Sequence, residues 1–273
     1  MEYSKYIITL VSILLLGLVY NKFKTYYSNG ENAIHYDLVR EHLLNDDTRP
    51  LVRTNKPIIW VHTKNEVNTN NWMSFGSAKT MNVNQPYKLI TLKTIVDKCG
   101  KDFNVYFIDD NTFSKIIPDW EIELNFVADP IRSNIRRLAM ARLLKTYGGM
   151  VVPSSLICLK SLREVYDNGI EGSGMFVGEL MNGGLRGPSK DHPNVSYPST
   201  LLMGCKKNCS TMDEYIKYLE RLNSRDFTAE SAFVGDDVEW CMKKIANSEL
   251  KLIPGRLLGA RNSDNGIMSL EQL

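Results

Sequence analysis

Three pairs of neighbouring polar side chains have the chemistry of a ligand site: Asp109 and Asp110, Arg136 and Arg137, and Ser154 and Ser155. Carboxylates can hold a divalent cation, guanidinium groups bind phosphate through paired hydrogen bonds, and hydroxyls can bond a sugar. The serines lack a Gly-x-Ser-x-Gly elbow and an identifiable base, so acyl transfer is not expected. We therefore predict these six side chains to bind substrate, and we assign no catalytic residue.

The arginine pair falls in a helix predicted between Asp129 and the glycine pair at 148–149. Asp129 can accept the first-turn N–H groups, and Pro130 fits the first helical position. The glycines suit a left-handed helix end, where a side chain would be strained. Arg142 falls among the apolar positions of this helix, so we expect it to be ion-paired or to reach solvent.

The other elements alternate along the chain and predict an α/β domain with a mainly parallel sheet. Strands are expected at residues 57–61, 104–108, 150–152, 175–177, 199–203 and 250–253. Further helices are expected at residues 86–98, 212–222 and 236–246. Pro153 ends the third strand, and the loop that follows lies where open α/β sheets hold ligands.

Composition limits the class of protein. The chain has 273 residues, of which 43% are hydrophobic, enough for one sizeable domain and an anchor. The net charge is +2, and no dense basic stripe is interleaved with aromatic residues, so a nucleic-acid partner is not expected. The five cysteines lack paired metal-ligand spacing and do not define a compartment.

The amino-terminal end has a different character. Residues 6–20 form an uncharged apolar run, slightly shorter than the roughly 20 residues that span a typical bilayer. No small-x-small cleavage site follows it, so we predict an uncleaved, single-pass membrane anchor rather than a signal peptide. Lysines flank both sides, so no orientation follows. The predicted divisions are an anchor at 1–24, a helix and polar connector at 25–55, and the compact domain at 56–273.

Taken in order, these segments resemble the DxD sugar-binding glycosyltransferases of family thirty-two. Lys56–Trp60 resembles the family's opening strand, Val105–Asp110 its second strand, and Ile135–Leu159 its signature region. Within the last, Tyr147-Gly148-Gly149 matches the family's Tyr-Gly-Gly. The resemblance covers residues 56 to about 205. It implies a GT-A, Rossmann-like fold, a nucleotide-sugar donor and a glycan acceptor.

The departures from the family pattern fall on functional positions. Pro153 and Ser155 occupy the places of the two metal-binding aspartates of Asp-x-Asp. Arg137 stands where the family carries an aspartate, and Met140 where it carries an arginine. Carboxylates hold Mg²⁺ or Mn²⁺, which neutralises the diphosphate leaving group, whereas proline offers no side-chain ligand. Metal binding in the family's usual mode is therefore not expected.

Three interpretations of these departures are open. In the first, sugar transfer persists without a metal and the cations at 136–137 stabilise the diphosphate, unless they only form an exposed helix face. In the second, the fold is retained as a catalytically inactive structural or scaffold protein. In the third, a displaced acid set holds a metal such as Mn²⁺. Its candidates are Asp109 and Asp110, Glu179, and Asp236 and Asp237.

Three residues also have structural interpretations. The aspartates at 236–237 open a predicted helix, where the helix dipole favours acids. His62 follows the first predicted strand, where it can approach a ligand, but a hydrogen-bonded structural histidine is the preferred interpretation.

The predicted function is that of a membrane-anchored glycosyltransferase-like protein. It binds or transfers a sugar from a nucleotide sugar without the usual Asp-x-Asp metal site and without another cofactor. The alternative is a catalytically inactive, membrane-attached structural protein. The Asn- and Lys-rich composition also resembles glycosyltransferase-like reading frames of large DNA viruses, in which setting the alternative would be a virion membrane component.

Overall fold

The computed structural model describes residues 17–20, 22, 55–63, 86–179, 197–225, 230–262 and 264. The chain divides into two compact units, Met1–His42 and Leu43–Leu273. In the first unit, residues 17–20 are helical. Within the described part of the chain, no helix is both long and apolar enough to span a membrane. The predicted anchor and connector lie almost wholly outside the described residues, so both stay predictions.

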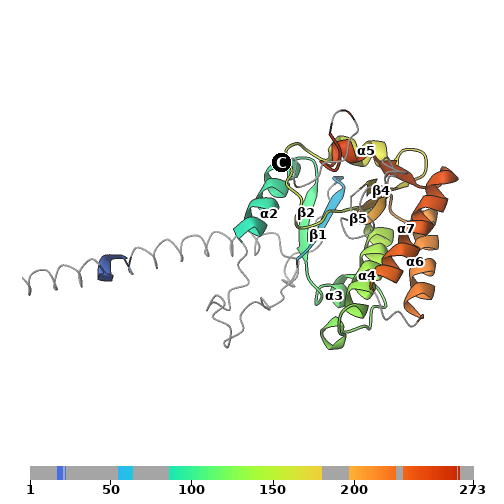
Figure 1. Cartoon of the computed structure of the whole chain (residues 1–273), viewed down its shortest axis with the longest axis horizontal. Helices are drawn as coiled ribbons and strands as arrows, with labels where there is room; N and C mark the ends of the chain where they lie inside the picture. Colours follow the sequence, from blue (N-terminus) through green and yellow to red (C-terminus); the bar gives the residue numbers. More distant parts are fainter. Residues whose placement is uncertain are drawn as a thin grey trace, which may run out of the picture. The chain divides into compact units, whose positions relative to one another are not determined.

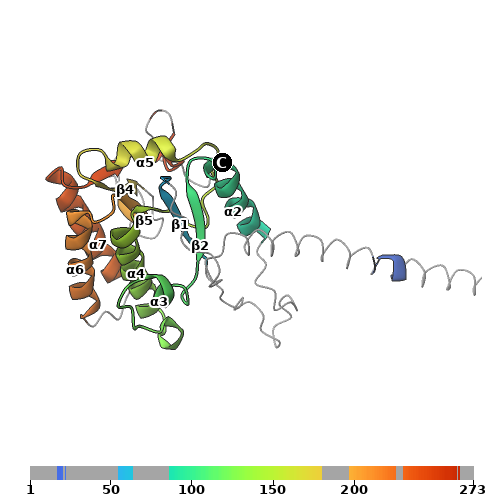
Figure 2. The same ribbon diagram turned by 180° about the vertical axis from the view of Figure 1, so that it is seen from behind.

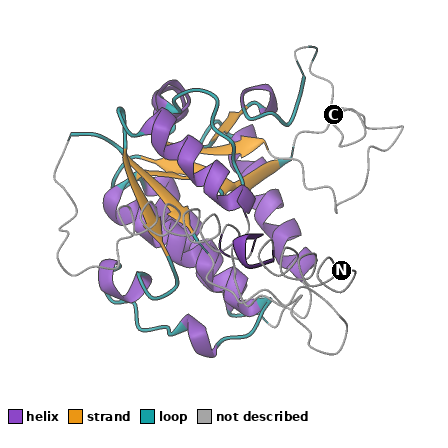
Figure 3. Ribbon diagram, turned by 90° about the vertical axis from the view of Figure 1, so that its left-hand side faces the viewer, coloured by secondary structure: helices purple, strands orange, loops and turns teal. Residues whose placement is uncertain are grey.

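A six-stranded sheet lies at the centre of the second unit (Figures 1 and 3). Its strands are β1 (Ile58–His62), β2 (Asn104–Ile108), β3 (Gly149–Val151), β4 (Met175–Glu179), β5 (Pro198–Cys205) and β6 (Lys251–Ile253). They are ordered β2-β1-β3-β5-β4-β6. Of these strands, β5 runs antiparallel to both neighbours, and the other pairings are parallel. The predicted mainly parallel α/β sheet is confirmed.

Helices cover both faces of this sheet. They are α2 (Pro86–Cys99), α3 (Phe113–Ile116), α4 (Ile131–Tyr147), α5 (Arg163–Ile170), α6 (Ser210–Asn223) and α7 (Glu230–Ala246). Short 3₁₀ turns span Leu124–Phe126 (η1) and Gly255–Leu257 (η2). Figure 1 shows α2 on one side of the strands and α4, α6 and α7 on the other, and Figure 2 gives the same arrangement from behind.

The two faces have separate apolar contacts because side chains alternate along each strand. Trp60 and Val177 belong to the core cluster that joins the sheet to α4, α6 and α7. Phe176 points to the opposite face, where its ring lies edge-on to Tyr166 of α5 at 6.2 Å. A Cβ at Gly169 would come within 2.4 Å of the Phe176 ring, so glycine lets α5 approach the sheet closely.

The turn from α4 into β3 brings the chain back to the sheet. Gly148 and Gly149 have φ angles of 75° and 96°, which favour glycine as predicted. Gly148 has a ψ angle of −167°, however, so the helix does not end in the left-handed helical conformation that was expected. A Cβ at Gly149 would lie 2.2 Å from the carbonyl oxygen of Ile58. Trp60 donates from Nε1 to the carbonyl oxygen of Gly148 at 3.1 Å. Only glycine allows β3 to begin this close to β1.

The beginning of α4 differs slightly from the prediction. The helix begins at Ile131 with Pro130 as its N-cap residue, and the Asp129 carboxylate accepts a hydrogen bond from the Ser133 hydroxyl at 2.7 Å. Arg142 is ion-paired as expected, because its Nη2 lies 2.6 Å from Oε1 of Glu220.

The prediction for the aspartates at 236–237 was wrong. Helix α7 begins at Glu230, so both residues lie in its interior and not in its first turn. Asp237 is only 3% exposed. A buried acid within a helix needs a partner from another element, and that partner belongs to the site described next.

Candidate ligand-binding site

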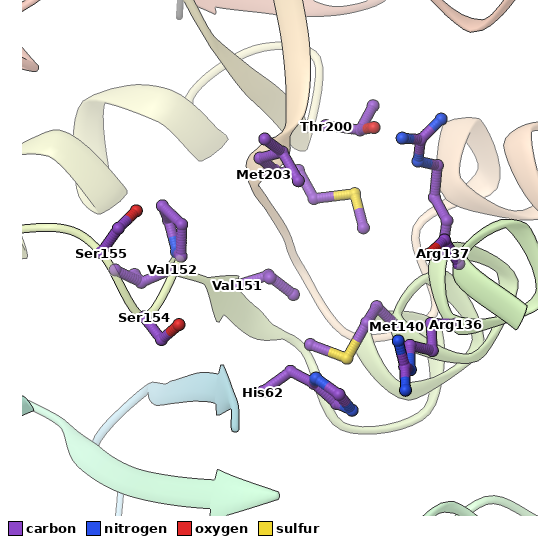
Figure 4. Close-up of a pocket in the computed structure, with 13 residues that line it drawn as sticks. His62, Arg136, Arg137, Met140, Val151, Val152, Ser154, Ser155, Thr200 and Met203 are labelled. Atoms are coloured by element: carbon purple, nitrogen blue, oxygen red, sulfur yellow. The ribbon is translucent and has the colours of Figure 1, made fainter. Parts of the chain in front are cut away.

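A cavity of about 440 Å³ lies at the carboxyl ends of β1 and β3 (Figure 4). Its hydroxyl-bearing residues are Ser133, Ser154, Ser155 and Thr200. Its apolar residues are Met140, Val151, Val152, Pro153, Leu201 and Met203. Its basic residues are His62, Arg136 and Arg137. The cavity therefore contains four of the six predicted site residues and neither member of the Asp109–Asp110 pair.

The strand order explains why the cavity lies there. After β1 the chain forms β2 on one side of it, and then returns past β1 to form β3 on the other side. Connections leave β1 and β3 in opposite directions, which opens a crevice at the carboxyl ends of these strands. Open α/β sheets bind ligands at such a switch point. β5 is antiparallel, and it contributes Thr200, Leu201 and Met203 to the lining.

The serine pair is held by bonds to the backbone of its loop. Thr91 of α2 donates from its hydroxyl to the carbonyl oxygen of Ser154 at 2.7 Å. The Thr94 hydroxyl accepts from the backbone N–H of Cys158 at 3.0 Å. The loop after β3 is therefore tied to α2 at two points, and the Ser154 and Ser155 side chains lie at the cavity (Figure 4).

Asp110 does not line the cavity, but its carboxylate contacts two of the lining residues, His62 and Arg136. The Arg136 guanidinium donates from Nε to Oδ1 at 2.7 Å and from Nη2 to Oδ2 at 2.6 Å. His62 Nε2 lies 2.9 Å from Oδ1. Burial by itself would raise the pKa of Asp110, but the hydrogen bonds from His62 and Arg136 outweigh burial and hold that pKa well below its usual range. Asp110 is therefore an ionised carboxylate.

Asp109 has a different environment from its neighbour. Its Oδ1 accepts from the Thr112 backbone N–H at 2.9 Å and from the Thr112 hydroxyl at 2.7 Å. The Thr112 hydroxyl in turn accepts from the Asp109 N–H at 3.1 Å. The carboxylate thus closes the turn that leads into α3, and it is only 4% exposed. Its predicted contact with substrate stays a prediction.

Arg137 pairs with an acid from a distant part of the chain. Its Nη1 lies 3.3 Å from Oδ2 of Asp237 in α7. Asp237 also accepts from the Thr200 hydroxyl at 2.8 Å and from the Tyr215 hydroxyl at 2.7 Å. Burial first, and then the charge of Asp237, raise the pKa of Tyr215 well above its usual range. The phenol therefore stays protonated and remains a donor.

These contacts decide between two views of the arginine pair. Arg136 is 7% exposed, and the Arg137 side chain is 17% exposed. The alternative that they form an exposed helix face is therefore wrong. Both are cavity residues, and Figure 4 shows them across the cavity from Ser154 and Ser155.

The donor set does not fit the divalent metal that the resembling family uses. Pro153 and Ser155 bring no carboxylate to the cavity, and both oxygens of Asp110 already accept hydrogen bonds. Glu179 is 4% exposed, pairs with Arg261 and accepts from a backbone N–H of η2. Across the described ranges, no three His, Cys, Asp or Glu side chains gather as a metal site. No chemical step is therefore assigned to a metal.

Several lining residues were not predicted from the sequence. Thr200 and Met203 come from β5, whose antiparallel direction could not be known before the sheet was assembled. Asp237 does not line the cavity; it was considered as a displaced metal ligand or as an acid at a helix start, and its contacts with Thr200 and Arg137 arise only from tertiary packing. His62 carried the only available signal, because it directly follows an apolar strand pattern.

No family model and no curated protein matches the chain. Among solved structures, 4-diphosphocytidyl-2C-methyl-D-erythritol synthase from Anaerococcus prevotii DSM 20548 is 12% identical, with a TM-score of 0.39, over 80% of this chain and 94% of that one. PaToxG glycosyltransferase is 13% identical, with a TM-score of 0.33, over 91% and 90%. These TM-scores are too low to transfer a fold or an activity. The resemblances to family thirty-two and to viral reading frames stay predictions.

Proposed function

We propose that the cavity binds a nucleotide sugar and that the chain is a glycosyltransferase-like protein with a GT-A-type domain. The observation that carries this proposal is the cavity at the switch point of the sheet, where guanidinium groups and serine hydroxyls face one another. These side chains are among those that the sequence predicts to bind substrate.

The lining suits the parts of such a ligand. A volume of about 440 Å³ falls within the range of roughly 300–1,000 Å³ that small-molecule sites occupy. The methionine and valine side chains offer apolar faces to a base or a sugar ring. Hydroxyls of Ser154, Ser155 and Thr200 can bond sugar hydroxyls. Arg136 and Arg137 provide planar cations for phosphate oxygens.

The site supports binding and transfer without a metal. In the resembling family a divalent cation balances the diphosphate, and here the position of one family aspartate carries Arg137 instead. A guanidinium that already pairs with Asp237 needs little reorganisation when charge develops on a leaving group. Preorganised cations of this kind can replace the electrostatic part of the metal's role.

Calorimetric titration of the full-length chain, purified in mild detergent because of the apolar run at 6–20, tests this proposal. The titrants are UDP, GDP, CDP and their sugar conjugates, first with Mn²⁺ and then with EDTA. We expect one nucleotide class to bind, and its binding to survive EDTA. A requirement for Mn²⁺ would favour the displaced acid set. Absence of binding to every titrant would favour the membrane-attached structural protein.

Matched variants locate the binding. Ser155 is exposed at the rim, so Ser155→Trp fills the cavity mouth without disturbing the core and should abolish binding. Arg137→Gln should weaken nucleotide binding at least about tenfold, because a charge-assisted bond contributes about 1.5–3 kcal/mol. Arg142→Gln is the control, since Arg142 lies on the same helix but outside the cavity and pairs with Glu220.

We also propose that residues 1–24 anchor the chain in a membrane, based on the uncharged run at 6–20. Expressed full-length chain should stay in the membrane pellet after extraction at alkaline pH, and a variant that lacks residues 1–24 should not. Release of the full-length chain by alkali would contradict the anchor.

A further inference from the structure

The His62 ring is fixed at the cavity by two contacts. His62 is the last residue of β1, and its Nε2 lies 2.9 Å from Oδ1 of Asp110. The ring also stacks on Phe113 with a centroid distance of 5.6 Å and an interplanar angle of 9°. Figure 4 shows the imidazole at the end of its strand, among the residues that line the cavity. The hydrogen bond to Asp110 and the stacking on Phe113 together hold the His62 ring in one orientation.

The partner of Nε2 assigns the proton on the ring. Asp110 is ionised and spanned by the Arg136 guanidinium, so its oxygens can only accept hydrogen bonds. Nε2 of His62 must therefore carry the hydrogen, and Nδ1 of the neutral ring has a lone pair. Within the part of the chain that the structure describes, the contact with Asp110 is the only hydrogen bond of the ring. Nδ1 is thus the basic atom that His62 contributes to the site.

We propose that His62 is the catalytic base of this cavity, that Asp110 positions it, and that its substrate is an acceptor hydroxyl. This inference rests on the proposed function. Nδ1 takes the proton of the acceptor hydroxyl as the acceptor oxygen bonds to the anomeric carbon. The bond from that carbon to the diphosphate oxygen breaks, and its electron pair leaves with the nucleoside diphosphate. The proton then passes from His62 to solvent, which restores the neutral ring.

A protonated His62 would supply positive charge in a cavity whose side chains do not fit a divalent metal. Before reaction, Asp110 and Arg136 offset one another, so the neutral imidazole adds no charge. When His62 accepts a proton, a cation forms beside the same cavity in which the diphosphate gains negative charge. The imidazolium is stabilised by Asp110 on one side and can stabilise the leaving group on the other. Proton transfer and leaving-group stabilisation therefore reinforce each other.

The position of the proton on the His62 ring can be measured first without a ligand and then with a nucleotide sugar. In the full-length chain labelled with ¹⁵N-histidine, two-bond ¹⁵N–¹H spectra distinguish the two neutral tautomers, and loss of signals in His62→Gln assigns the residue. We expect the Nε2–H tautomer at about pH 7.5 and a selective change at Nδ1 when a nucleotide sugar that binds in calorimetry is added. The Nδ1–H tautomer would overturn the inference, as would an Nδ1 unchanged by a saturating ligand.

Activity on that nucleotide sugar gives the second test. General base catalysis contributes about 10²–10⁴-fold, so His62→Gln should lower kcat by that factor while the nucleotide Kd changes less than about threefold. Among the residues that the structure describes, the charged groups around the ring are Asp110 and, through it, Arg136. Unchanged thermal unfolding of His62→Gln checks that this ion pair is intact.

The outcomes separate the two proposals. Binding with an unchanged kcat in His62→Gln overturns the base and keeps the proposed function. Absence of binding overturns the proposed function and the base with it. Arg142→Gln should keep both binding and kcat, because its ion pair lies outside the cavity.

Discussion

Removal of the Arg136 cation is the most informative perturbation of this site. Arg136→Met keeps the length and apolar stem of the side chain and deletes the guanidinium. The variant leaves Asp110, whose side chain is 15% exposed, with the single donor of His62. Removing one partner of a buried ion pair costs about 3–5 kcal/mol, and the remaining histidine bond places this case near the lower end.

The expected cost of about 3 kcal/mol should appear in urea unfolding at about pH 7, monitored by circular dichroism. For a domain of this size, 1 kcal/mol corresponds to roughly 2–4 °C, so the melting temperature should fall by roughly 6–12 °C. Arg142→Met is the matched control. Its partly exposed pair with Glu220 should contribute at most about 1 kcal/mol.

Lowering the pH should reduce the difference in free energy of unfolding between the wild type and Arg136→Met. The pKa of Asp110 is lowered in the folded state, so the stability it contributes is present above about pH 4, the range of an unfolded aspartate. That contribution is lost progressively as the pH falls further, because the unfolded aspartate then binds a proton that the folded carboxylate does not. In the Arg136→Met variant Asp110 contributes less stability above this pH, so less is lost in acid. At about pH 3 the two proteins should therefore differ less than at about pH 7.

A double variant completes the argument. Asp110→Asn combined with Arg136→Met removes both charges, so it should recover more than about half of the stability lost in Arg136→Met. A loss below about 1 kcal/mol in the single variant, a gap that widens in acid, or no recovery in the double variant would refute the reasoning about this ion pair.

Three further outcomes follow from the fold. Gly149→Ala should lower the free energy of unfolding in urea by at least about 2–3 kcal/mol more than Gly172→Ala. Both glycines have positive φ, but only a Cβ at Gly149 would meet a backbone carbonyl oxygen, at 2.2 Å. Equal costs would contradict the close approach of β3 to β1. Tyr215→Phe should lose about 1–3 kcal/mol in the same assay, since Asp237 loses a buried donor; a neutral effect would show that this bond is absent in solution. Brief treatment with iodoacetamide at about pH 8 should modify Cys209 alone among the five cysteines, because the other four are buried. Mass spectrometry identifies the modified residue, and early labelling of a second cysteine would place that thiol at the surface.

The sheet could be predicted because its strands have local signals. The strand predicted at 104–108 agrees with β2 at both ends, since an apolar run is bounded by a turn on each side. The glycines at 148–149 were predicted to end α4 because only that residue type suits the backbone there. By contrast, α5 was not predicted, because Arg163–Ile170 is only 8 residues long and buries only Tyr166 and Gly169, so its apolar signal is short.

The site was predicted less completely than the fold. Arg136 and Arg137 line the cavity, and their contact with substrate stays a prediction. The sequence could not give their partners, because Asp110 and Asp237 reach α4 from segments far apart in the chain. The roles of Asp109 and Asp110 could not be separated either. Neighbouring residues at a strand end point in opposite directions, so one closes a turn and the other reaches the cavity wall. Such differences arise only when the elements assemble.

The two consecutive arginines also have a consequence for cooperativity. Arg136 binds the carboxylate that follows β2, and Arg137 binds a carboxylate on α7, so a single turn of α4 connects an early and a late segment of the domain. Neither segment can separate from α4 without exposing the same cavity. Amide hydrogen exchange should therefore show β2, this turn of α4 and the middle of α7 opening as one unit. Occupancy of the cavity would then slow exchange in segments that the ligand never touches.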